Sequence, residues 1–167
     1  MKNIISFPLL ICLVFLFSCK LAKNDLHPGL TVNVEMLDSI KQHSDSTYEK
    51  PYSRTDFVTA AYFVSKKDSN VTQVMKDSSG TIRQLIIEKG NHRTYVATFY
   101  PNGQQQYKVS LDAFGQYHGA AKEFNPNGSI KRSGIYNHGL HAGKWENFDE
   151  GGKYVSTDEY NENGQEK

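Results

Sequence analysis

Three histidines that lie close together in the chain are the residues best suited to metal binding or proton transfer. His118, His138 and His141 have Glu123 and Glu146 nearby. A tetrahedral metal site needs three or four such donors that the fold brings together. These histidines occupy non-equivalent positions of the sequence repeat described below, so we interpret them as exposed loop residues and expect no bound metal. A metal-dependent enzyme built on them is therefore the weakest of three functional hypotheses.

No other segment carries a recognisable catalytic motif. The chain lacks a Gly-x-Ser-x-Gly elbow, a phosphate-binding Gly-x4-Gly-Lys-Ser/Thr loop and a His-Glu-x-x-His pair. Asp149-Glu150 and Asp158-Glu159 could form paired carboxylates, but no apolar segment beside them would shift their pKa values. We interpret them as a solvated hairpin end. We expect a protein that is not an enzyme and needs no cofactor.

The composition limits the class of partner. The chain has 167 residues, with 19 basic and 18 acidic side chains, and its length fits one domain. This balance argues against a nucleic-acid partner, because nucleic-acid binding requires a basic surface. Aromatic residues make up 12% of the chain, including 10 Tyr and 9 Phe, and aromatic side chains favour strands.

The N-terminal residues predict an export signal and a lipid anchor. The apolar run from Leu9 to Phe17 is shorter than the roughly 20 residues that cross a bilayer, so residues 1–18 read as a signal peptide. Leu16-Phe17-Ser18-Cys19 resembles the lipobox of bacterial lipoproteins, which implies acylation of Cys19 and attachment to a membrane of the cell envelope. We expect the outer membrane, with the protein facing the periplasm or the surface. The alternatives are a secretory signal cut elsewhere and an uncleaved anchor.

The remaining sequence divides into a tether and a β domain. Residues 19–54 are polar and contain Pro28, Gly29 and Pro51, so we expect a lipidated cysteine followed by a tether, with at most a short helix around Glu35 to His43. Residues 55–167 show a period of two and predict an all-β domain. Five strands are expected, at residues 57–64, 71–75, 81–87, 93–100 and 105–111, with hairpin turns at 77–80, 101–103 and 126–128.

A repeat of 24 or 25 residues is the most specific signal in the chain. It covers residues 74–166, and each unit carries Gly-x3-Gly-x4-Phe-x3-Gly or a part of it. One hairpin per unit explains this spacing, because glycine supplies left-handed backbone at turns and permits bulges. Trp145 aligns with Val96 and Ala121, three residues before each Phe, and should face away from a ladder of stacked Phe side chains. The repeat-defining residues are Gly90, Phe99, Gly103, Gly115, Gly119, Phe124, Gly128, Gly139, Gly143, Trp145, Phe148 and Gly152.

These units carry a family resemblance. Residues 139–152 resemble the MORN-type repeat in its bacterial YwqK-like variant, and residues 115–128 look like the preceding copy. The unit before departs from the pattern at Arg93-Thr94, where the second Gly is missing. The resemblance implies an elongated single-layer antiparallel sheet of successive β-hairpins. YwqK-like proteins are commonly labelled antitoxin or immunity components, which implies an unknown protein partner such as a toxin.

Tyrosines supply the candidate binding face. Tyr suits interfaces because one side of the ring is apolar and the hydroxyl is polar. Our first hypothesis is a lipid-anchored module that binds a protein, antitoxin-like by resemblance, through a face bearing Tyr100, Tyr107, Tyr117, Tyr136, Tyr154 and Tyr160. The second is a structural envelope lipoprotein that binds glycan or lipid.

Overall fold

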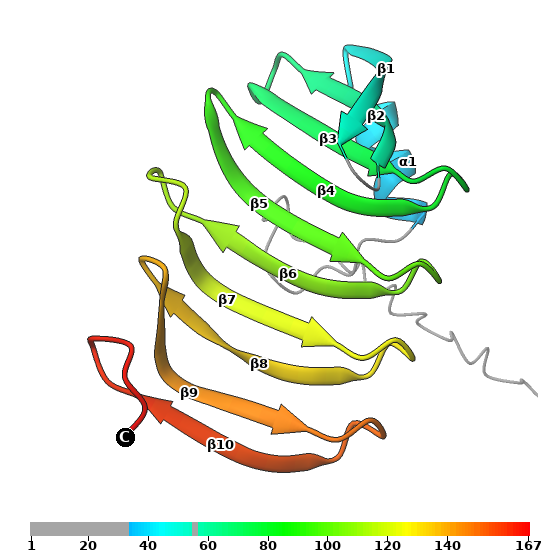
Figure 1. Cartoon of the computed structure of the whole chain (residues 1–167). Coiled ribbons are helices and arrows are strands. Elements are labelled where there is room, and N and C mark those ends of the chain that lie inside the picture. The colour runs from blue at the N-terminus through cyan, green and yellow to red at the C-terminus, as the bar shows by residue number, and fades with distance from the viewer. Residues whose placement is uncertain (1–33, 55–56) are drawn as a thin grey trace, which may run out of the picture.

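The computed structural model describes residues 34–54 and 57–167, which form one helix and one antiparallel sheet (Figure 1). The ten strands follow one another across the sheet in chain order, and each is hydrogen-bonded only to its sequence neighbours. The protein is therefore all-β, an open single-layer sheet of successive hairpins, as the sequence predicts. The strands are β1 (Ser46–Arg54), β2 (Phe57–Ser65), β3 (Asn70–Lys76), β4 (Ile82–Lys89), β5 (His92–Phe99), β6 (Gln105–Leu111), β7 (Tyr117–Phe124), β8 (Ile130–Asn137), β9 (Leu140–Phe148) and β10 (Tyr154–Tyr160).

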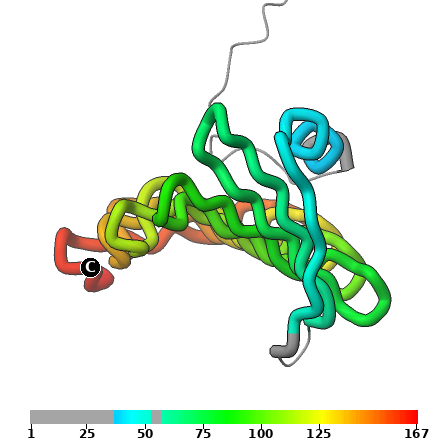
Figure 2. The backbone as a smooth tube through the Cα atoms, turned by 90° about the horizontal axis from the view of Figure 1, so that it is seen from above, coloured from blue at the N-terminus to red at the C-terminus, as the bar shows by residue number. Residues whose placement is uncertain are grey.

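The ordered domain begins before residue 55, where the sequence analysis placed its start. Helix α1 (Val34–Gln42) packs Leu37 and Ile40 against one face of the sheet, and β1 pairs with β2 along its length. Figure 2 shows α1 lying over the end of the sheet that β1 and β2 form. Charged residues and Pro51 hide β1 in the sequence, but an edge strand tolerates proline. Residues 57–73, which precede the sequence repeat, join the same sheet in β2 and β3.

Six turns share one geometry, and glycine is needed at the same place in each. Each turn spans five residues. The first residue donates its N–H to the carbonyl of the fifth, and the fourth residue, always Gly, donates its N–H to the carbonyl of the first. These glycines have φ between +73° and +86°, a region that other residues rarely adopt. The turns begin at Asp77, Tyr100, Asp112, Asn125, Asp149 and Asn161.

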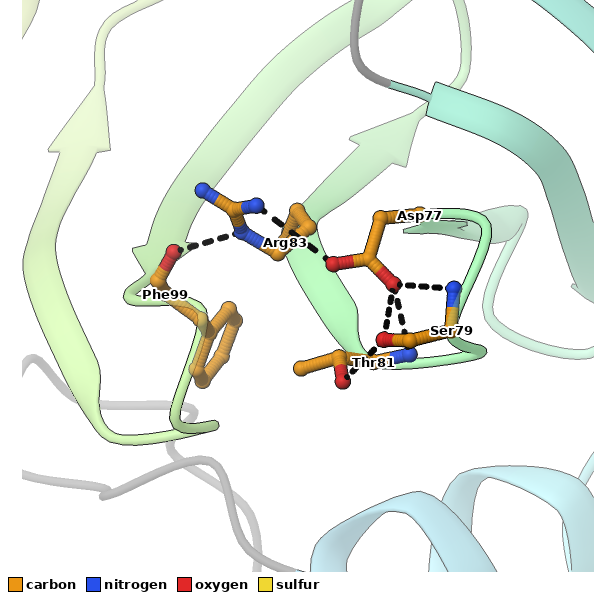
Figure 3. A network of polar contacts seen from close by, with 5 residues as sticks. All are labelled: Asp77, Ser79, Thr81, Arg83 and Phe99. Carbon is orange, nitrogen blue, oxygen red and sulfur yellow. Dashed lines mark hydrogen bonds and ion pairs between the residues drawn. The ribbon is translucent and has the colours of Figure 1, made fainter.

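The first of these turns shows how an acidic residue fixes the loop (Figure 3). Asp77 Oδ1 accepts hydrogen bonds from the backbone N–H groups of Ser79 at 2.9 Å and Thr81 at 3.0 Å, while its Oδ2 lies 3.4 Å from Arg83. The Ser79 hydroxyl also donates to Asp77 Oδ1, at 2.6 Å. This hydrogen bond is the main cause that lowers the pKa of Asp77, and the backbone and Arg83 hydrogen bonds add to it, against a smaller opposing effect of burial. Arg83 in turn donates to the Phe99 carbonyl at 3.1 Å, which links two hairpins.

The second glycine of each repeat coincides with a bulge. The strand register shifts between Val109 and Leu111 opposite Gly119, and between Ser133 and Ile135 opposite Gly143. Both glycines have positive φ. In the earlier unit, where this glycine is missing, β4 and β5 still shift register, at Ile87/Glu88. The bulge therefore does not require this glycine.

The sheet buries side chains on both faces. We call the Phe face the side that carries Ala97, Phe99 and Phe124, and the Trp face the side that carries Val109 and Trp145. The larger core lies on the Phe face of β2–β5, under α1, and includes Val74, Leu85, Ile87 and Phe99. Two smaller cores lie on the Trp face, one around Ile86 with Val96 beside it and one around Trp145. Val96 and Phe99 therefore lie on opposite faces of the sheet, as the sequence predicts.

Candidate functional site

A cluster of aromatic rings covers the Trp face of β6–β10. Adjacent rings meet at centroid distances of 6.0 Å for Tyr107–Tyr117, 5.3 Å for Tyr117–Tyr136 and 5.0 Å for Tyr136–Trp145. His141 extends the chain of contacts, at 4.4 Å from Trp145 and 4.7 Å from Tyr160. Each strand of this half contributes at least one member. We call these six residues the aromatic cluster.

Trp145 is the buried centre of this cluster. It is 0% exposed, although it lies on one face of a single-layer sheet. The ring lies flat over Gly134, where an added Cβ would come within 2.2 Å of ring carbon Cδ2, and its Nε1 donates to the Ile135 carbonyl at 3.1 Å. A neighbouring glycine in β8 thus creates the space for the indole, and the sequence analysis did not single it out.

Arg132 closes the other side of Trp145 and carries a charge into the cluster. Its guanidinium carbon lies 4.6 Å from the indole centroid, a cation–π distance, and Nη2 donates to Asp158 at 3.0 Å and to the Tyr160 hydroxyl at 2.7 Å. Burial alone would lower the pKa of Arg132, but Tyr160 and Asp158 raise it above its ordinary value. The guanidinium is therefore charged and held in place.

His141 belongs to the aromatic cluster and not to a ligand set. Its Nε2 lies 3.1 Å from the Tyr136 hydroxyl. Burial lowers the pKa of His141, and the positive charge of Arg132 lowers it further, against smaller opposing effects of Glu123 and Asp158. The neutral imidazole is the favoured form, which suits a ring packed between Trp145 and Tyr160.

The outer rings of the cluster remain accessible. Tyr117 is 40% exposed, and Tyr107, Tyr136, His141 and Tyr160 are half-buried. Burial raises the pKa of Tyr107, and the neighbouring Tyr136 raises it further, so this hydroxyl stays neutral. No described element packs over these rings, since α1 lies on the other face at β2–β5. The cluster therefore forms a partly exposed patch with a rigid, buried centre.

Two of the six tyrosines expected on a binding face lie elsewhere. Tyr100 sits in the β5–β6 turn, where its hydroxyl donates to the Phe124 carbonyl at 2.9 Å. Tyr154 is 54% exposed and pairs with Phe148, on the Phe face. The structure brings together Tyr107, Tyr117, Tyr136 and Tyr160.

Two of the three repeated Phe residues are buried, and the expected ladder of stacked Phe rings does not form. Phe99 is 4% and Phe124 9% exposed, while Phe148 is half-buried beside Tyr154. Among the described rings, the contacts of β6–β9 run instead through Tyr, His and Trp on the opposite face. Lys108, in β6, is buried between Phe99 of β5 and Phe124 of β7, and its Nζ lies 5.7 Å from the Phe124 ring centroid. Burial, and to a smaller extent the charge of Lys122, lowers the pKa of Lys108 to about 8.

The other two histidines meet an aspartate at one end of the sheet. His138, in the β8–β9 turn with φ +47°, places Nδ1 2.7 Å from Asp112 Oδ2, and the rings of His118 and His138 are 4.8 Å apart. Burial alone would raise the pKa of Asp112, but the Gln116 backbone N–H and His138 lower it below its ordinary value. The sequence analysis grouped these histidines with His141 and did not point to Asp112, because Asp112 comes close only when two turns stack.

No family model matches this chain, and no curated protein matches it. Two solved structures are similar, a crystal structure of TarM and one of an S. aureus TarM mutant in complex with Fondaparinux, alpha-GlcNAc-glycerol and UDP. Each has a TM-score of 0.35 and 15% identity over 64% of this chain, which spans only 22% and 23% of those chains. A likeness at this level carries no functional argument.

Within the described residues, no helix has the length and apolarity to span a bilayer. The predicted signal peptide, residues 1–18, and the predicted acylation site, Cys19, lie outside the described residues.

Proposed function

We propose that the protein is a non-enzymatic binding module that captures a protein partner on the aromatic cluster of the Trp face. The observation that carries the proposal is the partly exposed patch of Tyr107, Tyr117, Tyr136, His141 and Tyr160 around a fully buried Trp145. Tyr, Trp and Arg are the residues most enriched at the energetic centres of protein interfaces.

The rigidity of the patch supports the same conclusion. Arg132 is held by Asp158 and Tyr160, and Trp145 is fixed against Gly134. A surface whose side chains are already ordered loses little conformational entropy when a partner binds. Asp158 neutralises the positive charge of Arg132 beside the rings, so the partner surface should be mainly apolar.

The cellular setting follows from the sequence. Acylation of Cys19 would hold the module at the envelope, with the partner captured there, and a toxin neutralised by occupation is the specific form that the YwqK-like resemblance suggests. This part of the proposal depends on palmitate labelling: the unsubstituted protein should incorporate label, and Cys19→Ala should not. Label retained by Cys19→Ala would contradict the anchor.

The binding face is tested by capture from the native envelope with three forms of the full chain. The double variant Tyr117→Ala, Tyr136→Ala removes two outer rings, and Tyr154→Ala removes an equally large ring from the Phe face as a matched control. We expect one dominant protein to be recovered with the unsubstituted chain and with Tyr154→Ala, and at least about tenfold less with the double variant.

Two outcomes would contradict the proposal. Equal recovery of the partner by the double variant would show that the aromatic cluster is not the contact surface. Recovery of envelope glycan or lipid alone, by all three forms, would favour the structural-lipoprotein hypothesis instead.

A further inference from the structure

A second potential site lies outside the aromatic cluster, where the β6–β7 turn meets the β8–β9 turn. Within the described residues, Asp112, His118 and His138 place one ligand atom each within 4.8 Å of the other two. Asp112 directly follows β6 and begins the β6–β7 turn, His118 lies near the start of β7, and His138 comes from the β8–β9 turn. Three elements therefore converge on one point.

The carboxylate is already oriented for a ligand. Asp112 Oδ1 accepts hydrogen bonds from the backbone N–H groups of Phe114 and Gln116, both at 2.9 Å, which leaves Oδ2 facing His138 at 2.7 Å. Side-chain exposure of Asp112 is only 10%. Metal-binding carboxylates are held in this way by hydrogen bonds from groups behind them.

The two histidines complete the donor set from a fixed backbone. The Gly139 N–H donates to the Tyr117 carbonyl at 2.8 Å, so the β8–β9 turn is tied to the start of β7 beside His118. The His118 and His138 side chains are exposed and can rotate. In a tetrahedral zinc site, donor atoms about 2.0–2.2 Å from the metal lie about 3.4 Å apart, a separation that small rotations reach from the observed geometry.

We propose that Asp112, His118 and His138 bind one divalent transition-metal ion, with Zn²⁺ the ion that this donor set suits. Two imidazoles and one carboxylate supply three ligands, and the exposed side of the site leaves the fourth position to water or to a partner's side chain. The metal would connect two adjacent hairpin turns. His141, which the sequence grouped with these histidines, is excluded because it packs within the aromatic cluster on the Trp face.

Calorimetric titration of the purified full chain with Zn²⁺ at pH 7.5 tests the site. Any free thiol that the purified protein retains at Cys12 or Cys19 is alkylated beforehand because thiolates bind zinc. The variants are His118→Ala and His138→Gly, the latter chosen because glycine adopts φ +47° without strain and preserves the turn. His92→Ala removes an exposed histidine from another hairpin and serves as the control.

We expect one equivalent of Zn²⁺ to bind the unsubstituted chain and His92→Ala alike. Loss of a group that merely hydrogen-bonds a metal ligand weakens metal binding by about 10–100-fold. Loss of a ligand itself should therefore weaken Zn²⁺ binding by at least about tenfold in each variant. Zinc should also raise the Tm of the unsubstituted chain and not that of His138→Gly. Absence of saturable binding, or equal affinity in both ligand variants and the unsubstituted chain, would overturn the proposal.

Discussion

At the scale of single residues, the aromatic cluster depends on the missing side chain at position 134. Gly134→Ala would force a methyl group into the Trp145 ring, because no Cβ fits 2.2 Å from an indole carbon. Overpacking of this kind costs about 1–3 kcal/mol of unfolding free energy. Urea unfolding of Gly134→Ala should show this loss.

Gly151→Ala provides the matched control for that substitution. Gly151 also lacks a positive φ, and its added Cβ would meet only the Asp149 carboxylate at 3.3 Å. The change should stay within about 0.5 kcal/mol. Equal destabilisation by the two substitutions would show that Trp145 does not need the bare backbone.

His141 predicts how the same cluster responds to acid. Its folded-state pKa is lowered below 6.5 by burial and by Arg132, with Glu123 and Asp158 opposing, so below pH 6.5 the unfolded chain binds the proton first. The stabilising effect is complete above pH 6.5 and is lost as the pH falls through the lowered pKa. Urea midpoints at pH 7.5 and 5.5 should therefore differ more for the unsubstituted chain than for His141→Gln. An identical pH response in the two proteins would contradict this.

At the scale of elements, hydrogen bonds between equivalent turns join one hairpin to the next. Asn102 Nδ2 donates to the Pro126 carbonyl at 2.8 Å, and Asn127 Nδ2 donates to the Glu150 carbonyl at 2.7 Å. Each amide also accepts from its own turn through Oδ1, as Asn127 does from Ser129. One asparagine thus closes its turn and docks it on the next.

Asn127→Asp separates these two roles. The carboxylate keeps the acceptor for Ser129 and removes the donor to Glu150, so the loss should be about 0.5–1.5 kcal/mol. Asn163 occupies the equivalent place in the last turn, and its side chain makes no inter-turn hydrogen bond to the residues that the structure describes. Asn163→Asp is therefore the charge-matched control. Equal urea midpoints for the two variants would show that the inter-turn bond adds nothing.

Elements that depend on local backbone geometry could be predicted from the sequence, whereas contacts across bulges could not. Gly103, Gly115, Gly128 and Gly152 all mark turns, because positive φ is a local requirement. The strands of residues 57–111 also lie close to their predicted bounds.

The side-chain contacts that could not be predicted from the sequence depend on strand register. Trp145 meets Gly134 and His138 meets Asp112 only after bulges shift one strand against another. Strand β1 was missed because its alternating Tyr48, Lys50 and Tyr52 do not read as apolar, although Tyr48 stacks on Tyr62 at 4.8 Å. A larger apolar count would have revealed it.

At the scale of the whole molecule, the sheet behaves as a linear array of hairpins. Strands contact their sequence neighbours, and the larger core of β2–β5 is separate from the smaller core around Trp145. Stability in such arrays is a sum of local terms, and unfolding need not be two-state. Figure 1 shows this progression from β1 to β10.

Trp145, the only tryptophan, reports on the C-terminal half alone. Its fluorescence should therefore change at a lower urea concentration than the far-ultraviolet circular dichroism, which follows the whole sheet. Coincident transitions would show instead that the two cores unfold as one unit.

Site-specific photocrosslinking in living cells shows whether the aromatic cluster of the Trp face contacts a protein partner. A photoreactive phenylalanine analogue replaces Tyr117 in one form of the full chain and Tyr154, on the Phe face, in another. We expect one dominant crosslinked protein from position 117 and little or none from position 154. Equal crosslinking from both positions, or none from position 117, would contradict it.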